Sequence, residues 1–168
     1  MRERARDKGR LEDIVEYSTN VTNLIEGYSL EALIADKRTY YSVMKNIEVV
    51  GEAAYMLTKV FKRSHPEIPW KIVQGMRHVL VHDYANVVSE TLYDTAVNDM
   101  LPLRRQVEHY LAETDWDEWQ SAPDDFEDTV DDVRRANIAT ARKMKAKGYA
   151  TADISEITGL TEEQVEGL

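Results

Sequence analysis

Apolar side chains recur along this chain at intervals of three and four residues, which is the spacing of one face of an α-helix. One such stripe predicts a helix over about residues 8–27, and a longer one predicts a helix from a cap at Asp36 to about Arg63. Between them, Ser29 can cap a short helix. No segment shows the sustained period of two that is typical of a strand, so the pattern predicts an all-α protein.

Prolines and a serine mark the elements that follow. Pro66 and Pro69 bracket a loop, and a helix begins directly after it with proline at its first position. Ser89 opens a further helix with its own apolar stripe, in which Pro102 should cause a kink or remove one backbone hydrogen bond. We therefore expect residues 1–112 to form an antiparallel bundle of four or five helices.

The composition changes after this bundle. Ten Asp and Glu residues and no Lys or Arg fall within residues 113–132. Such a run is typical of a solvated linker, and the alternative is an acidic arm that covers an active cleft by imitating phosphate. Trp116 and Trp119 could hold this stretch on the bundle.

Residues 133–168 predict a C-terminal helical appendage. Gly148 ends its first helix, Gly159 ends its second, and Thr161 begins its third with the form of a capping box. The turn at Gly159 resembles a helix-turn-helix. Glutamates crowd the third helix, however, and would be repelled by DNA phosphates, so we expect an interaction appendage instead of a DNA reader.

Charge and composition narrow the possible functions. The 168 residues carry a net charge of -10, which excludes a broad nucleic-acid coat and confines any RNA contact to a small positive cleft. The chain has no cysteine, which fits a reducing cytoplasm. It also has no apolar run long enough to span a membrane and no signal-peptide pattern at its start, so we expect a cytoplasmic protein.

The candidate chemistry lies in the helix after Pro69, where Arg77, His82 and Tyr84 form the pattern R-x-x-x-x-H-x-Y. Arginine holds a phosphate through paired donors, and histidine exchanges protons near neutral pH. RNA carries its own nucleophile, the 2′-hydroxyl, so Arg77 and His82 could cleave it without a metal. One chain offers one such pair, which favours two chains that share a cleft.

Each of these residues also has a structural interpretation. Arg77 could pair with Glu52 or Glu48 of the long helix. His82 could be a histidine at a helix end, stabilised by the helix dipole, and Tyr84 a packed aromatic residue. His78 and His82 have a spacing that can bind zinc, but no third ligand is evident, so we expect no metal and no other cofactor.

The motif, together with Gly51-Glu52-Ala53-Ala54 and Pro69-Trp70, resembles the HEPN superfamily and most closely the HepT toxins of prokaryotic toxin–antitoxin pairs. The resemblance covers about residues 8–112. It implies a HEPN-like helical bundle and a metal-independent endoribonuclease that works as a homodimer, with Arg77 and His82 as catalytic residues and Glu52 and His78 in support.

The same resemblance implies a partner, a nucleotidyltransferase antitoxin of the MNT type that attaches AMP to the motif tyrosine, here Tyr84. One departure from the family pattern is His78, which stands where a small polar residue such as Asn or Asp is usual. The alternative function is a non-catalytic HEPN-like module that binds a nucleotidyltransferase partner or a nucleotide.

Overall fold

A computed structural model describes residues 3–82, 88–122 and 130–168; within these ranges the side chains of residues 78–82, 130–133 and 135 are not described. Helices account for all the regular structure of this described part, which contains no strand, so the prediction of an all-α fold is confirmed. The chain divides into two compact units, Met1–Pro123 and Asp124–Leu168.

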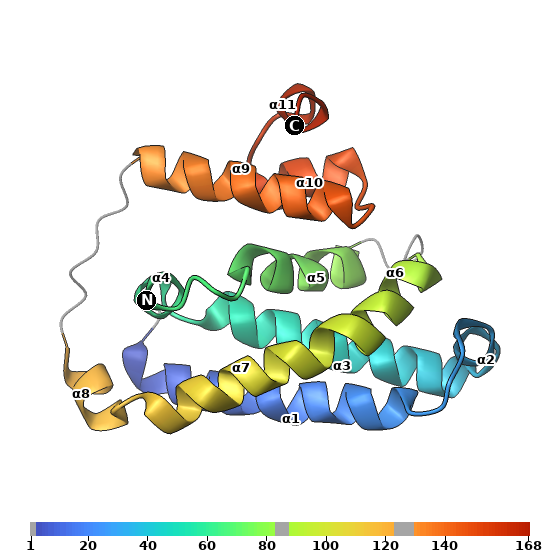
Figure 1. Cartoon of the computed structure of the whole chain (residues 1–168), viewed down its shortest axis with the longest axis horizontal. Coiled ribbons are helices and arrows are strands. Elements are labelled where there is room, and N and C mark those ends of the chain that lie inside the picture. Colours follow the sequence, from blue (N-terminus) through green and yellow to red (C-terminus); the bar gives the residue numbers. More distant parts are fainter. Residues whose placement is uncertain (1–2, 83–87, 123–129) are drawn as a thin grey trace. The chain divides into compact units, whose positions relative to one another are not determined.

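Four helices form the body of the first unit and run alternately in opposite directions (Figure 1). Helix α3 packs against both α1 and α5, and α7 packs against α1. The four are α1 (Asp7–Ile25), α3 (Lys37–Met56), α5 (Trp70–His82) and α7 (Met100–Glu113). Shorter helices lie between or after them: α2 (Leu30–Ala35), α4 (Lys59–Ser64), α6 (Ser89–Asp94) and α8 (Trp116–Ser121).

The core of the first unit consists of the apolar stripes that the sequence shows. Ser29 caps α2 by accepting a hydrogen bond from the Ala32 N–H, and Asp36 caps α3 by accepting from the N–H groups of Arg38 and Thr39. Fully buried side chains come from α1, α3, α4 and α7 and include Leu11, Ile14, Ile47, Val50, Phe61, Met100 and Val107.

The prediction of one continuous helix from Asp36 to Arg63 is wrong, because the helix is interrupted at residues 57–58. Helix α3 ends at Met56, and α4 begins after Thr58, whose hydroxyl accepts a hydrogen bond from the Phe61 N–H. Thr58 is also bound from a distant part of the chain, because its N–H and its hydroxyl both donate to the carboxylate of Asp7. The apolar stripe continues across this break, which is why periodicity alone could not reveal it.

The helix predicted from Ser89 is continuous but irregular. A π-helical turn at Thr95–Asp99 joins α6 to α7. Pro102 has no N–H to donate to the carbonyl oxygen of Asn98, which lies in that turn. The irregularity therefore lies one turn before the proline, on the side where the backbone hydrogen bond is missing.

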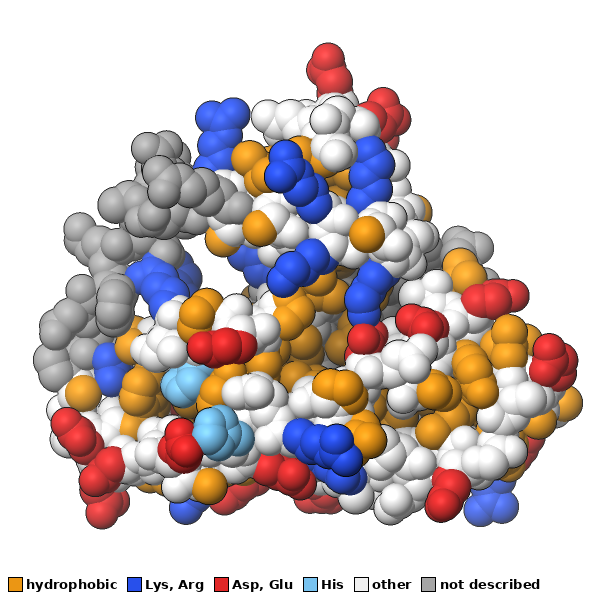
Figure 2. Space-filling model, viewed as in Figure 1, with side chains coloured by type: hydrophobic (Ala, Val, Ile, Leu, Met, Phe, Trp, Pro, Cys, Tyr) orange, Lys and Arg blue, Asp and Glu red, His pale blue; other side chains and the backbone are white. Residues whose placement is uncertain are grey.

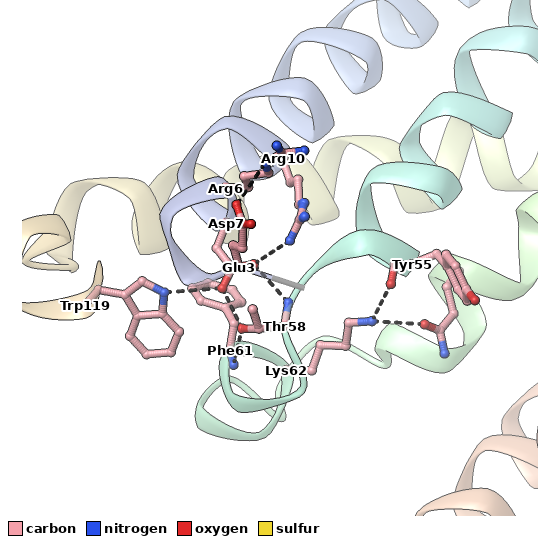
Figure 3. A network of polar contacts seen from close by, with 10 residues as sticks. Glu3, Arg6, Asp7, Arg10, Tyr55, Thr58, Phe61, Lys62 and Trp119 are labelled. Atoms are coloured by element: carbon pink, nitrogen blue, oxygen red, sulfur yellow. Dashed lines mark hydrogen bonds and ion pairs between the residues drawn. The ribbon is translucent and has the colours of Figure 1, made fainter. Parts of the chain in front are cut away.

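The acidic stretch begins as part of the bundle. Helix α8 lies within it, and Trp116 and Trp119 both pack against the core. The indole N–H of Trp119 donates to Asp7, which has no exposed surface and also accepts from Arg10 and Thr58 (Figure 3). The two tryptophans therefore hold the start of the acidic stretch on the first unit, as their spacing suggested.

In its described residues, 130–168, the second unit forms three helices: α9 (Val130–Ala146), α10 (Thr151–Thr158) and α11 (Glu162–Glu166). Gly148 and Gly159 have positive φ angles of 82° and 71°, a conformation that glycine adopts without strain. Thr161 and Gln164 form the predicted capping box. The ammonium group of Lys145 donates to the carbonyl oxygens of Val165 and Glu166 at the end of α11.

Candidate active site

The guanidinium of Arg77 is held on the surface of the first unit by two residues of α3. It forms an ion pair with the carboxylate of Glu52, and its central carbon lies 5.5 Å from the centre of the Tyr55 ring. The Arg77 side chain remains 34% exposed, so it can still reach a ligand from solvent. Of the two carboxylates considered from the sequence, Glu52 is the partner, whereas Glu48 pairs with Lys45 at 2.6 Å.

Gly51 explains why Arg77 and Glu52 meet. A Cβ atom at Gly51 would lie 2.9 Å from the Arg77 nitrogen, 3.0 Å from its Cβ and 3.1 Å from the carbonyl oxygen of Val73. Only glycine allows the backbones of α3 and α5 to approach this closely. The close approach places residue 52 beside residue 77, although they are 25 positions apart.

The other predicted site residues are only partly described. His78 and His82 belong to α5 by their backbone, and their side chains lie outside the described part; Tyr84 lies outside the described residues altogether. The roles given to His78, His82 and Tyr84 therefore stay predictions. Arg77 and Glu52 are the two predicted site residues that the structure brings together.

Sequence reasoning missed Tyr55, which lies against Arg77, and Lys62, which contacts Tyr55. Tyr55 follows Glu52 by three residues on α3, so the two share a helix face. Lys62 of α4 donates to the carbonyl oxygen of Tyr55 at 3.0 Å and to the side-chain oxygen of Gln74 at 3.1 Å. The i, i+3 spacing from Glu52 could have identified Tyr55 as a site residue. The contact of Lys62 with Tyr55 could not be foreseen, because it requires the unexpected break between α3 and α4.

Arg77 carries a positive charge in a chain whose net charge is -10. Figure 2 shows Asp and Glu side chains spread over the visible face of the bundle, in keeping with the net charge of -10. On α5 itself, partial burial lowers the pKa of the Lys71 ammonium, whereas a guanidinium stays protonated at any ordinary pH. Arg77 therefore carries a positive charge at any ordinary pH, and a phosphate would be attracted only locally.

The described residues contain neither a candidate metal site nor a helix that could cross a membrane. Among them, no group of three or more His, Cys, Asp or Glu side chains is arranged to hold a metal ion. None of the described helices combines the length and the apolar character that crossing a membrane requires.

Known proteins that are similar in sequence to this chain are named as ribonucleases. The family model described as "Ribonuclease HepT-like" matches residues 11–110. A protein of Thermococcus cleftensis named "Probable ribonuclease HepT" is 35% identical over 101 residues, which cover 60% of this chain and 92% of that protein. No solved structure gives a significant match.

Two further relatives carry similar names. MJ1216 of Methanocaldococcus jannaschii, named as a candidate RNase, is 32% identical over 62% of this chain and 86% of its own length. TTE0752 of Caldanaerobacter subterraneus, also named as a candidate RNase, is 30% identical over 60% of this chain and 90% of its own length. Because the family model spans more than half of the residues and includes the helix that carries Arg77, the chain belongs to the HepT-like ribonuclease family.

Proposed function

We propose that this protein is a metal-independent endoribonuclease that uses Arg77 and His82. The observation that carries the proposal is the partly exposed guanidinium of Arg77, which Glu52 of α3 holds in place in a chain of the HepT-like family. Arg77 lies on α5, the helix that also carries His82. A buried structural arginine would not leave its charge within reach of a phosphate.

In the proposed reaction the 2′-oxygen of one nucleotide forms a bond to the adjacent phosphorus, and the bond from phosphorus to the 5′-oxygen breaks. A base takes the proton of the 2′-hydroxyl, and an acid supplies a proton to the leaving 5′-oxygen. His82 acts in this proton transfer, and Arg77 stabilises the negative charge that develops on the phosphate oxygens. The products are a 2′,3′-cyclic phosphate and a 5′-hydroxyl.

The test uses purified wild type, Arg77→Ala and His82→Ala, each incubated with RNA in EDTA without any partner protein. Loss of the histidine should slow cleavage by about 10²–10⁴-fold, and loss of the arginine by about 10²–10³-fold. Matched controls are Arg105→Ala and His109→Ala, because both residues are exposed on α7. An inactive wild type, or a His82→Ala protein as fast as wild type, would overturn the proposal.

We further propose that the enzyme is a toxin whose activity is silenced by a nucleotidyltransferase antitoxin that adenylylates Tyr84. The support is the family, together with the position of Tyr84 two residues after His82. Mass spectrometry after co-expression should show added adenylate on the wild type and none on Tyr84→Phe. Adenylate that persists on Tyr84→Phe would place the modification elsewhere.

A homodimer in the cytoplasm completes the proposal, because one chain supplies one Arg77–His82 pair and a shared cleft would hold two. Sedimentation should give twice the chain mass of 19.3 kDa.

The net charge of -10 supports the alternative, a non-catalytic module that binds a nucleotidyltransferase or a nucleotide. Partner binding by wild type and by His82→Ala alike, with no RNA cleavage by either, would favour that alternative.

A further inference from the structure

An exposed aromatic side chain lies directly beside Arg77. Tyr55, near the end of α3, is 42% exposed, and the guanidinium of Arg77 lies over its ring at 5.5 Å from the centre. Proteins that bind single-stranded RNA commonly place an aromatic ring next to a cation, so that the ring stacks on a base while the cation contacts the phosphate. Tyr55 and Arg77 provide this pair of groups at one place.

Lys62 brings a second positive charge to the same place. Its ammonium group reaches from α4 to the carbonyl oxygen of Tyr55 at 3.0 Å and to Gln74 at 3.1 Å (Figure 3). Gln74 and Arg77 are three residues apart on α5, which puts them on one face and about 4.5 Å apart along the helix axis. Lys62 therefore contacts α5 about one helical turn before Arg77.

The short helix α4 extends this positive region. Its six residues include Lys59, Lys62 and Arg63 and no acidic residue, and Lys59 is exposed. In a chain with a net charge of -10, such a strip is a local site where a polyanion can approach against an otherwise repelling surface.

We propose that Tyr55, Lys59 and Lys62 form a binding site for single-stranded RNA next to Arg77. The Tyr55 ring stacks on the base beside the scissile phosphate, and the two lysines contact the phosphates of the neighbouring nucleotides. The inference rests on the proposed ribonuclease function for its substrate and adds a preference. A base paired within a duplex cannot leave its stack to lie on Tyr55, so the site selects unpaired RNA.

The test measures RNA binding separately from cleavage. The full chain carrying His82→Ala is titrated with a fluorescent single-stranded RNA of about 12 nucleotides, and with the corresponding duplex. On this background, Tyr55→Ala should weaken binding of the single strand by about tenfold or more, whereas Tyr55→Phe should keep it within about twofold. The duplex should bind the parent about tenfold more weakly than the single strand.

Lys62→Gln provides a second variant that does not alter the ring. It should reduce the slope of the logarithm of affinity against the logarithm of salt concentration by about 0.7, the value for one lost phosphate contact on a single strand. Arg105→Gln removes an exposed charge on α7 and should leave both affinity and slope unchanged. Circular dichroism and urea unfolding of each variant confirm that it is folded.

The two proposals can fail separately. If Tyr55→Ala and Lys62→Gln bind single-stranded RNA like the parent, the binding site is overturned even when the wild type cleaves RNA. If the wild type cleaves no RNA but binding still depends on Tyr55 and Lys62, the binding site stands and the ribonuclease function falls.

Discussion

The carboxylate of Asp7 has no exposed surface. Hydrogen-bond donors surround it and offset the cost of removing its charge from water. It accepts hydrogen bonds from Arg10, from the indole of Trp119, and from both the N–H and the hydroxyl of Thr58. The three donor residues come from different parts of the chain: Arg10 from α1, Trp119 from α8 and Thr58 from the start of α4. Asp7 therefore joins three elements through one side chain.

Replacing Asp7 with alanine should lower the free energy of unfolding by about 3–5 kcal/mol, because the charge of Arg10 and the donors of Thr58 would lose their partner inside the protein. Urea unfolding measures this change. Asp13→Ala on the same helix is the control: partial burial and the nearby Glu16 and Glu12 raise the pKa of Asp13, so its charge is unfavourable there. A loss of stability in the control as large as that of Asp7→Ala would contradict this account.

Gly51 allows a second prediction for a single residue. Gly51→Ala would force a Cβ atom against the backbone of Arg77 and Val73, and should cost about 1–3 kcal/mol in unfolding free energy. It should also slow RNA cleavage, because α3 would no longer hold Glu52 beside Arg77. Gly9→Ala is the matched control on α1, where a Cβ meets nothing within 4 Å, and should be neutral or stabilising. Equal effects of the two substitutions would show that the close approach is unimportant.

At the scale of elements, the cap at the start of α3 is also bound to the loop that joins α1 to α2. The carboxylate of Asp36 accepts hydrogen bonds from the hydroxyl of Thr39 at 2.6 Å and the phenol of Tyr28 at 2.9 Å, besides capping the helix. The hydrogen bond from the Thr39 hydroxyl, followed by that from Tyr28, lowers the pKa of Asp36 below its ordinary value of 3.8.

The sign of the resulting pH dependence follows from that direction. A carboxyl whose pKa is lowered in the folded protein stabilises the fold above pH 3.8, and this contribution is lost as the pH falls through the folded pKa. Asp36→Asn should therefore melt at a lower temperature than wild type at pH 7, and the difference should shrink at pH 3 or below. Thr39→Val, which removes the strongest donor, should show a smaller pH-dependent difference of the same sign. A gap that grows on acidification would contradict the assignment.

At the scale of the whole molecule, the first compact unit runs to Pro123 and includes α8. Composition placed the end of the bundle at residue 112, but α8 and its two tryptophans belong to the first unit. The acidic residues of α8 do not prevent this helix from packing on the first unit, because its contacts with the core are made by Trp116 and Trp119. We therefore propose that the bundle extends through α8.

Two truncations test this boundary. A chain that ends at Ala122 should keep the stability of the first unit and its RNA cleavage, because Arg77, Glu52 and α8 are all retained. A chain that ends at Ala112 loses the burial of Trp116 and Trp119 and should be less stable by about 2–3 kcal/mol in urea unfolding. Equal stability of the two truncated chains would show that α8 contributes nothing to the bundle.

The sequence by itself determined the features that depend on neighbouring residues. The all-α fold, the caps at Ser29, Asp36 and Thr161, and the helix ends at Gly148 and Gly159 all follow from local spacing and backbone preference. The motif around Arg77 also indicated the family, because its residues lie within eight consecutive positions of the sequence.

Only the tertiary structure decided the features that join distant residues. The break between α3 and α4 involves hydrogen bonds from Thr58 to Asp7, 51 positions earlier, which no local pattern could show. The choice of Glu52 over Glu48, and the arrival of Lys62 beside Tyr55, depend on how α3, α4 and α5 pack. Helices form from near neighbours, whereas a site is made by packing, and so the sequence indicated Arg77 while the fold supplied its surroundings.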